Sequence, residues 1–151
     1  MPELSPRQFI SDVARQFPDA PAIDYLGDDQ FELVWKGARL ETGVSSAPSG
    51  STVFLGQASC DVALVAEAVT ILKAIFSDEI VAMTAIDSGH FVRYFLTRTE
   101  DPTAVFNDGV YRGRGFNTPL YSRLLFRSWT GAADFGDDPT PDELGTGTAV
   151  V

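Results

Sequence analysis

The sequence predicts an α+β fold in which an antiparallel sheet of about five to six strands packs against two to three helices, followed by an extended acidic C-terminal tail. Two observations support this prediction. Short segments of alternating apolar and polar residues follow one another across turns of a few residues, which is typical of antiparallel neighbours. Longer segments with apolar residues at helical spacing stand before, between and after these runs. The 151 residues are the length of a single domain with its own core.

The first helix is expected directly after residue 5. Ser5 is a favourable N-cap, Pro6 suits the first helical position, and Gln8 stands where a capping box requires it. Pro18 would end the helix because it has no backbone N–H and disfavours helical geometry before it. One face of this helix is apolar and is expected to be buried; it consists of Phe9, Ile10, Val13 and Phe17.

Four short strands are expected next, joined by tight turns into an antiparallel meander. The alternation is clearest in the second strand, where apolar residues alternate with mostly charged ones from Phe31 to Lys36. Each of the turns between the strands contains glycine, which favours a tight reversal of the chain. The expected strands are Ala22–Leu26, 31–36, Arg39–Ser46 and Thr52–Gly56.

A second helix is expected over residues 60–77, with Ser59 or Asp61 as its N-cap. Its apolar residues form two adjoining stripes, so that few polar residues interrupt them. A helix that is apolar around most of its circumference is expected to be buried on more than one side. The two stripes are Val62, Val65, Val69, Leu72 and Phe76, and Leu64, Ala68, Ile71 and Ile75.

Two hairpins are expected after the second helix. The longer one joins Glu79–Asp87 to His90–Arg98 across a Ser-Gly turn, and both arms are rich in apolar and β-branched residues. The shorter one joins residues 105–106 to 110–111 across an Asn-Asp-Gly turn. The longer hairpin completes the expected sheet of five to six strands, and the shorter one would form a smaller ribbon.

A last helix is expected from Thr118, as N-cap with Pro119 in the first position, to about Trp129. From residue 131 onward Pro, Gly, Thr and acidic residues dominate, which is typical of an extended tail. We therefore expect a single α+β domain over residues 1–130 and an acidic tail over residues 131–151. The residues of the last helix expected to face the core are Leu120, Tyr121, Leu124 and Leu125.

Charges are sorted along the chain. Residues 1–92 carry 13 acidic and 5 basic side chains, a net charge of −8. Residues 93–130 hold six arginines against three acidic residues, a net charge of +3, and residues 131–151 carry five acidic residues and no base. This distribution indicates contacts with other macromolecules, or between the tail and the body.

The overall acidity argues against two classes of partner. With a sequence pI near 4.3, the chain lacks the concentrated positive surface that nucleic acid and anionic membranes require. The same charge favours a basic protein partner, because complementary charges steer association. An acidic face for such a partner is expected from seven of the acidic residues among the first 41 positions: Glu3, Asp19, Asp24, Asp28, Asp29, Glu32 and Glu41.

The tail is expected to dock on arginines of the same chain or of a neighbouring one. Exposed ion pairs contribute only ~0–1 kcal/mol each, so several pairs must act together. The acidic residues of this predicted contact are Asp134, Asp137, Asp138, Asp142 and Glu143. The arginines are Arg112, Arg114, Arg123 and Arg127.

Cys60 and His90 are the one pair that could carry out nucleophilic catalysis. Cys60 would lie at the N-terminus of the second helix, where the helix dipole lowers the pKa of a thiol, and His90 would begin a strand. Against this, Asp61 opposes thiolate formation, and no third residue that would orient the histidine is evident. A small buried cysteine and a histidine near a turn are the simpler interpretation, so we expect no catalytic residue.

No metal site or cofactor is expected, since one cysteine and one histidine exclude the usual structural zinc sites. One cysteine also excludes an internal disulfide, and the N-terminus lacks the features of a signal peptide. Residues 62–76 are too short an apolar run to span a bilayer. We expect a cytoplasmic protein, or one in a particle assembled in the cytoplasm.

Taken together, these features favour a non-catalytic acidic subunit that acts through protein–protein contacts in a larger assembly, such as a virion or a secretion-type complex. Its partner would be another protein or copies of itself. The order of the elements resembles that of secretion chaperones and some phage tail-completion subunits, but no motif residue carries the resemblance. One alternative is a stand-alone inhibitor, immunity protein or chaperone that masks a basic partner. The other is a small cysteine hydrolase that uses Cys60 and His90.

Overall fold

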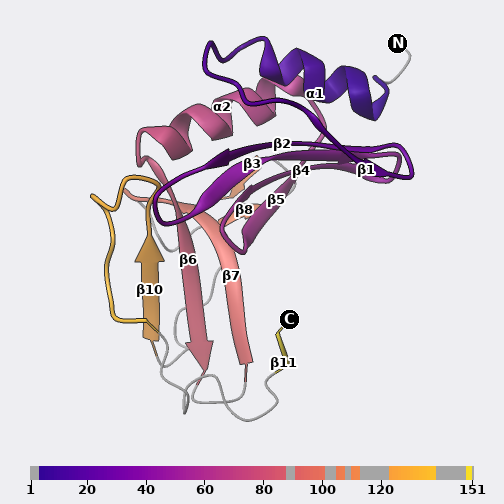
Figure 1. The fold of residues 1–151 in the computed structure, drawn as a ribbon. Coiled ribbons are helices and arrows are strands. Elements are labelled where there is room, and N and C mark those ends of the chain that lie inside the picture. Colours follow the sequence, from indigo (N-terminus) through magenta and orange to yellow (C-terminus); the bar gives the residue numbers. More distant parts are fainter. Residues whose placement is uncertain are drawn as a thin grey trace.

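The computed structural model describes residues 4–87, 91–100, 105–107, 110–112, 123–138 and 149–150 (Figure 1). Two helices lie across one face of a five-stranded antiparallel sheet, and a second sheet extends from beneath them. The predicted α+β class is therefore confirmed, but the described strands form separate sheets of five, four and two strands in place of the single sheet of five to six that was expected. The elements are α1 Pro6–Ala14, β1 Asp24–Gly27, β2 Gln30–Lys36, β3 Glu41–Ala47, β4 Gly50–Leu55, β5 Ala58–Val62, α2 Val65–Phe76, β6 Ile80–Asp87, β7 Phe91–Arg98, β8 Val105–Asn107, β9 Val110–Arg112, β10 Arg123–Arg127 and β11 Ala149–Val150.

Helix α1 begins as the sequence predicts. The Ser5 side chain accepts a hydrogen bond of 3.1 Å from the backbone N–H of Gln8, and Pro6 occupies the first helical position. The helix ends at Ala14, earlier than expected, and the chain continues through a turn to Phe17. The predicted apolar face is buried against the sheet and α2.

The five-stranded sheet follows the chain in the order β1-β2-β3-β4-β5, with every neighbouring pair antiparallel. Its first four strands correspond to the four predicted ones. The prediction that a helix starts at residue 60 is wrong, because residues 58–62 form β5. Their side chains alternate between buried and exposed positions, which a strand on a half-covered sheet requires and a helix does not allow.

Helix α2 begins at Val65, where Glu67 caps it. The Glu67 carboxylate accepts hydrogen bonds of 2.9 Å from the backbone N–H groups of Ala63 and Leu64, which precede the helix. These two backbone N–H groups lie between β5 and α2, and the bonds to Glu67 give them the acceptors that they would otherwise lack. The residues of α2 that are buried between the sheet, α1 and β6 are Ala68, Val69, Ile71, Leu72 and Ile75.

The core lies between the helices and one face of the five-stranded sheet. Leu33, Val44, Val53 and Cys60 are aligned across β2 to β5, and each is at most 5% exposed. An aromatic group extends this layer at the end of α2. Its rings make edge contacts with centroid separations of 5.1 to 5.9 Å; they belong to Phe17, Trp35, Phe76 and Trp129.

The second sheet has the order β10-β6-β7-β11. Strands β6 and β7 form the longer predicted hairpin, and β8 and β9 pair as the shorter one. The expected last helix is wrong over residues 123–129, because β10 pairs there with β6, from Arg123 opposite Ile86 to Arg127 opposite Ala82. Pairing supplies hydrogen-bond partners to the outer edge of β6, and this tertiary requirement overrides the local preference of a Leu-rich segment. The start of that helix, at residues 118–122, lies outside the described residues.

Neither of the described helices is long and apolar enough to cross a bilayer.

We expect the core position Leu72, which is fully buried, to be sensitive to truncation. Leu72→Ala should lower the free energy of unfolding by ~2–5 kcal/mol, because it leaves a cavity among side chains that cannot close it. Lys73→Ala, on the exposed side of the same turn, should change it by less than ~0.5 kcal/mol. Urea denaturation of the two variants measures both values. Equal losses for the two variants would contradict the placement of this helix face.

Candidate functional site

The helices cover only one face of the five-stranded sheet, and the opposite face is largely polar and acidic. We call it the open face. Asp24 on β1 lies opposite Glu32 on β2, and the same row continues through Ser45 and Thr52 to Asp61 on β5. Glu41, on β3, points to the same side. The charged residues of β1 to β3 on the open face are Asp24, Glu32, Lys36 and Glu41.

Two like charges face each other on this row. Residues directly opposite in an antiparallel pair have Cβ atoms only ~5 Å apart, so carboxylates at Asp24 and Glu32 repel. The pKa of Glu32 is raised above its ordinary value, first because the side chain is partly buried and then because of the charges of Asp24 and Glu41. Within the part of the chain that the structure describes, no ion pair neutralises these three carboxylates. Lys36 lies directly opposite Glu41 on this face and offsets part of the charge, so the excess of negative charge is concentrated at Asp24 and Glu32.

Strand β1 is the last strand on its side of the sheet among the described residues, and its helix side is apolar. Tyr25 is 62% exposed and Ile23 is 38% exposed. The ring of Tyr25 lies 5.0 Å from that of Phe31 on β2. These residues line a hollow of about 530 Å³ together with Arg7 and Ser11 of α1 and Asp29.

The turn from β1 to β2 adds two more carboxylates. Asp28 and Asp29 both have positive φ angles, of 53° and 58°, and Gly27 and Gln30 pair on either side of them. A two-residue turn with both residues in this region matches the twist of a hairpin, where Asn, Asp and Gly are the usual occupants. Aspartate tolerates this conformation better than most residues with a side chain. The tip of the hairpin thus carries two carboxylates.

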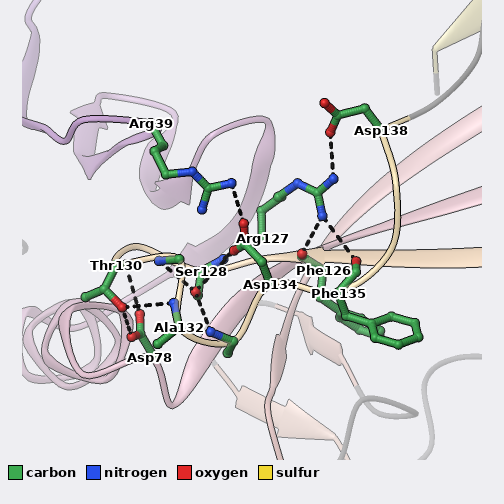
Figure 2. A network of polar contacts seen from close by, with 12 residues as sticks. Arg39, Asp78, Phe126, Arg127, Ser128, Thr130, Ala132, Asp134, Phe135 and Asp138 are labelled. Carbon is green, nitrogen blue, oxygen red and sulfur yellow. Dashed lines mark hydrogen bonds and ion pairs between the residues drawn. The ribbon is translucent and has the colours of Figure 1, made fainter.

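A second polar site joins the C-terminal part of the chain to the body (Figure 2). Asp134 forms an ion pair with Arg39 and accepts a hydrogen bond of 2.8 Å from the backbone N–H of Ser128. Burial acts to raise the pKa of Asp134, but the hydrogen bonds from Arg39 and Ser128 and the charge of Arg39 outweigh it and hold this pKa below its ordinary value. The Ser128 hydroxyl accepts bonds from the N–H groups of Gly131 and Ala133, at 3.1 and 3.0 Å. These bonds hold residues 128–134 in a compact turn.

Arg127 fixes the next part of this segment. Its guanidinium donates hydrogen bonds to the carbonyl oxygens of Phe126 and Phe135, at 2.8 and 3.1 Å, and to the Asp138 carboxylate, at 2.6 Å (Figure 2). The backbones of Phe126 and Phe135 also form a two-bond bridge. Residues 128–138, which we call the C-terminal segment, are therefore bound to the body of the protein.

The C-terminal segment also contacts the end of α2 and the turn before β3. The Asp78 carboxylate accepts hydrogen bonds from the backbone N–H and the hydroxyl of Thr130. The ring of Trp129 lies against Gly37 so closely that a Cβ atom there would come within 2.8 Å of it. Both contacts connect the core to residues far away in the sequence, so this second polar site has a structural role.

The structure describes only some of the residues that were predicted to dock the tail. The structure pairs Arg127 with Asp138 in the same chain, whereas Asp134 pairs with Arg39, which the sequence analysis did not select. Asp137 lies in the described segment and is exposed. The remaining members lie outside the described residues or have side chains outside them: Asp142, Glu143, Arg112, Arg114 and Arg123. Arg39 carried no sequence signal, because only the fold brings it to residue 134.

The predicted position of Cys60 at a helix N-terminus is wrong. Cys60 lies in the middle of β5, is 5% exposed, and points to the helix-covered face. No helix dipole acts on its thiol there, because α2 begins five positions later at Val65. His90 lies outside the described residues. Among the residues that are described, no three His, Cys, Asp or Glu side chains are grouped so that they could hold a metal ion.

Comparison of the chain with protein-family models, with curated proteins and with solved structures finds no significant match.

The ion pair of Asp134 predicts a specific acid sensitivity. Because the folded pKa is lowered, this carboxylate contributes stability that is present above its ordinary pKa of 3.8 and is lost as the pH falls through the folded value. Asp134→Asn should lower the free energy of unfolding by about 1 kcal/mol at pH 7. The difference from wild type should shrink below about pH 4.

Denaturation curves from pH 7 to pH 3 check this prediction. Asp19→Asn removes an exposed carboxylate for which no partner is described, and it serves as the control. A constant difference between Asp134→Asn and wild type over the whole range would contradict the role of the ion pair.

The burial of Cys60 predicts an unreactive thiol. Alkylation by iodoacetamide at pH 7.5 should be slow in the folded protein and become rapid in denaturant, because the sulfur is shielded from reagent. Cys60→Ala should leave partner binding unchanged. Rapid alkylation of the folded protein, together with loss of a measurable activity in the alanine variant, would instead support the hydrolase hypothesis.

Proposed function

We propose that this chain is a non-catalytic, acidic protein-binding subunit of a larger assembly, of the virion or secretion-complex type, and that the open face receives a basic partner. The observation that carries the proposal is the pair of carboxylates at Asp24 and Glu32, which lie opposite each other and form no ion pair among the described residues. Like charges placed opposite each other cost stability in the free protein. A partner that supplies positive charge relieves this repulsion, and the relief adds to the free energy of binding.

The burial of Cys60 supports binding rather than catalysis by this residue, since a nucleophile must reach its substrate. The acidic surface also supports the alternative of a stand-alone inhibitor or chaperone, because both functions use the same complementarity. The two differ in stoichiometry. An assembly subunit forms higher-order complexes with its partner, whereas an inhibitor forms a complex of fixed and small size.

Charge complementarity predicts that Glu32→Gln has opposite effects on folding and on binding. Removing the charge relieves the repulsion from Asp24 and Glu41, so the free energy of unfolding should rise by ~0.2–1 kcal/mol at pH 7. The gain should disappear as the pH falls through the raised pKa of Glu32, because wild type is then neutral at this position too. Affinity for a basic partner should fall. Glu100→Gln, at an exposed carboxylate of the second sheet region, should do neither.

Affinity capture from the source cell with immobilised wild type, Glu32→Lys and Glu100→Lys tests the proposal. A basic protein that binds wild type and Glu100→Lys in stoichiometric amounts, but not Glu32→Lys, supports it. Light scattering of the purified complex at two concentrations then separates an assembly subunit from an inhibitor. Equal capture by all three proteins would contradict a role for the open face.

A further inference from the structure

The two edges of the five-stranded sheet differ. Strand β5 lies against β7 of the second sheet, whereas no strand among the described residues pairs with the outer edge of β1. In an antiparallel strand, alternate residues turn their N–H and C=O groups away from the existing neighbour. The outer edge of β1 therefore presents backbone groups that can pair with an incoming strand.

A hollow for side chains lies beside this edge. It opens between α1 and the first two strands, has a volume of about 530 Å³, and is lined in part by Ile23, Tyr25 and Phe31. The Tyr25 ring is 62% exposed although it rests against Phe31, so a large apolar surface is left uncovered. Side chains of an added strand alternate between the two faces of the sheet. Every second one would enter this hollow.

The other side chains of an added strand would lie over the open face, next to Asp24 and Glu32. Asp28 and Asp29 add negative charge at the tip of the hairpin, and Asp29 also lines the hollow. Lysine or arginine at these positions would offset the repulsion between the opposed carboxylates of Asp24 and Glu32. Arg7 is the one base among the residues that line the hollow, and it lies on the opposite, helix side. The hollow holds one base and one acid, Arg7 and Asp29, whereas Asp24 and Glu32 on the open face are both acidic, so basic side chains of the added strand are favoured over the open face.

A second copy of this chain fits the edge poorly. Pairing of β1 with another β1 would bring the carboxylates of Asp24, Asp28 and Asp29 from the two copies close to one another, and like charges at a pairing edge are a recognised barrier to such association. The occupant is therefore a different, basic segment.

We propose that an extended segment of a partner protein, with alternating basic and aliphatic residues, adds to the outer edge of β1 as a sixth strand. Its aliphatic side chains fill the hollow beside α1, and its basic side chains lie over Asp24 and Glu32. This inference rests on the proposed function and adds to it the chemical class and the conformation of the bound segment.

The probe is the peptide Lys-Val-Lys-Ile-Lys-Val-Lys with blocked ends, titrated into the full chain by calorimetry at low ionic strength. Its affinity should exceed that of the same residues in the order Lys-Lys-Val-Ile-Val-Lys-Lys by about tenfold, because only the alternating order places each side chain on its proper face. Two N-methylated versions test the backbone bonds. Methylation of one alternate set of amides should reduce affinity about tenfold, and methylation of the other set should have little effect, since only one set faces β1.

Variants of the chain locate the site. Tyr25→Ala and Asp24→Asn should each weaken binding about tenfold, whereas Leu64→Ala, at a 62% exposed apolar residue before α2, should not. Circular dichroism of each variant confirms that it is folded. Equal binding of the alternating and reordered peptides, or equal effects of the two methylated sets, would overturn strand addition.

Failure of this inference is distinct from failure of the proposed function. Peptides that bind regardless of order, but lose affinity in Asp24→Asn, would overturn strand addition and leave charge-based binding at the open face intact. Charge variants that keep both their affinity for the peptide and their capture of the partner protein would overturn both proposals. Concentration-dependent dimerisation that the peptide abolishes would assign the edge to a second copy and contradict the choice of occupant.

Discussion

The structure depends on the burial of α2. This helix is apolar around most of its surface, so that the sheet, α1 and β6 must all contribute to its cover. Its position commits one face of the five-stranded sheet to the core, where Leu33, Val44, Val53 and Cys60 are aligned. Both described helices cover that face. The opposite face is left to polar and acidic side chains, and β1 is left as an edge.

The C-terminal segment connects this core to the second sheet. Trp129 extends the aromatic group at the end of α2, and Asp134 reaches back to Arg39 in the first half of the chain. Because Arg127 also binds the carbonyl of Phe135, the segment is fixed at several points between residues 126 and 138 (Figure 2). Arg39 and Arg127 thus form ion pairs with carboxylates of the C-terminal segment. They form no described ion pair with the open face, so their positive charge does not offset its carboxylates.

Much of the fold follows from local sequence signals, and the exceptions have physical reasons. The Ser5-Pro6 start, the β2 alternation and the β6–β7 hairpin depend on neighbours in sequence, which is why they were predictable. Strand β5 was missed because residues 58–62 read as a continuation of the apolar run of α2, although their strict alternation in burial shows a strand. Strand β10 was missed because its partner, β6, lies some forty residues away. The acidic residues of the candidate site were identified, but their alignment across β1 and β2, and the apolar hollow behind them, arise only from the register of the sheet.

The most direct test of this account is hydrogen–deuterium exchange of the full chain alone and with the basic partner that it captures. Binding at the acidic open face and its edge predicts new protection at the amides of β1 and β2, with exchange in β10 and the C-terminal segment unchanged. Protection confined to β10 and residues 128–138, with β1 and β2 unaffected, would contradict the assignment of the binding surface.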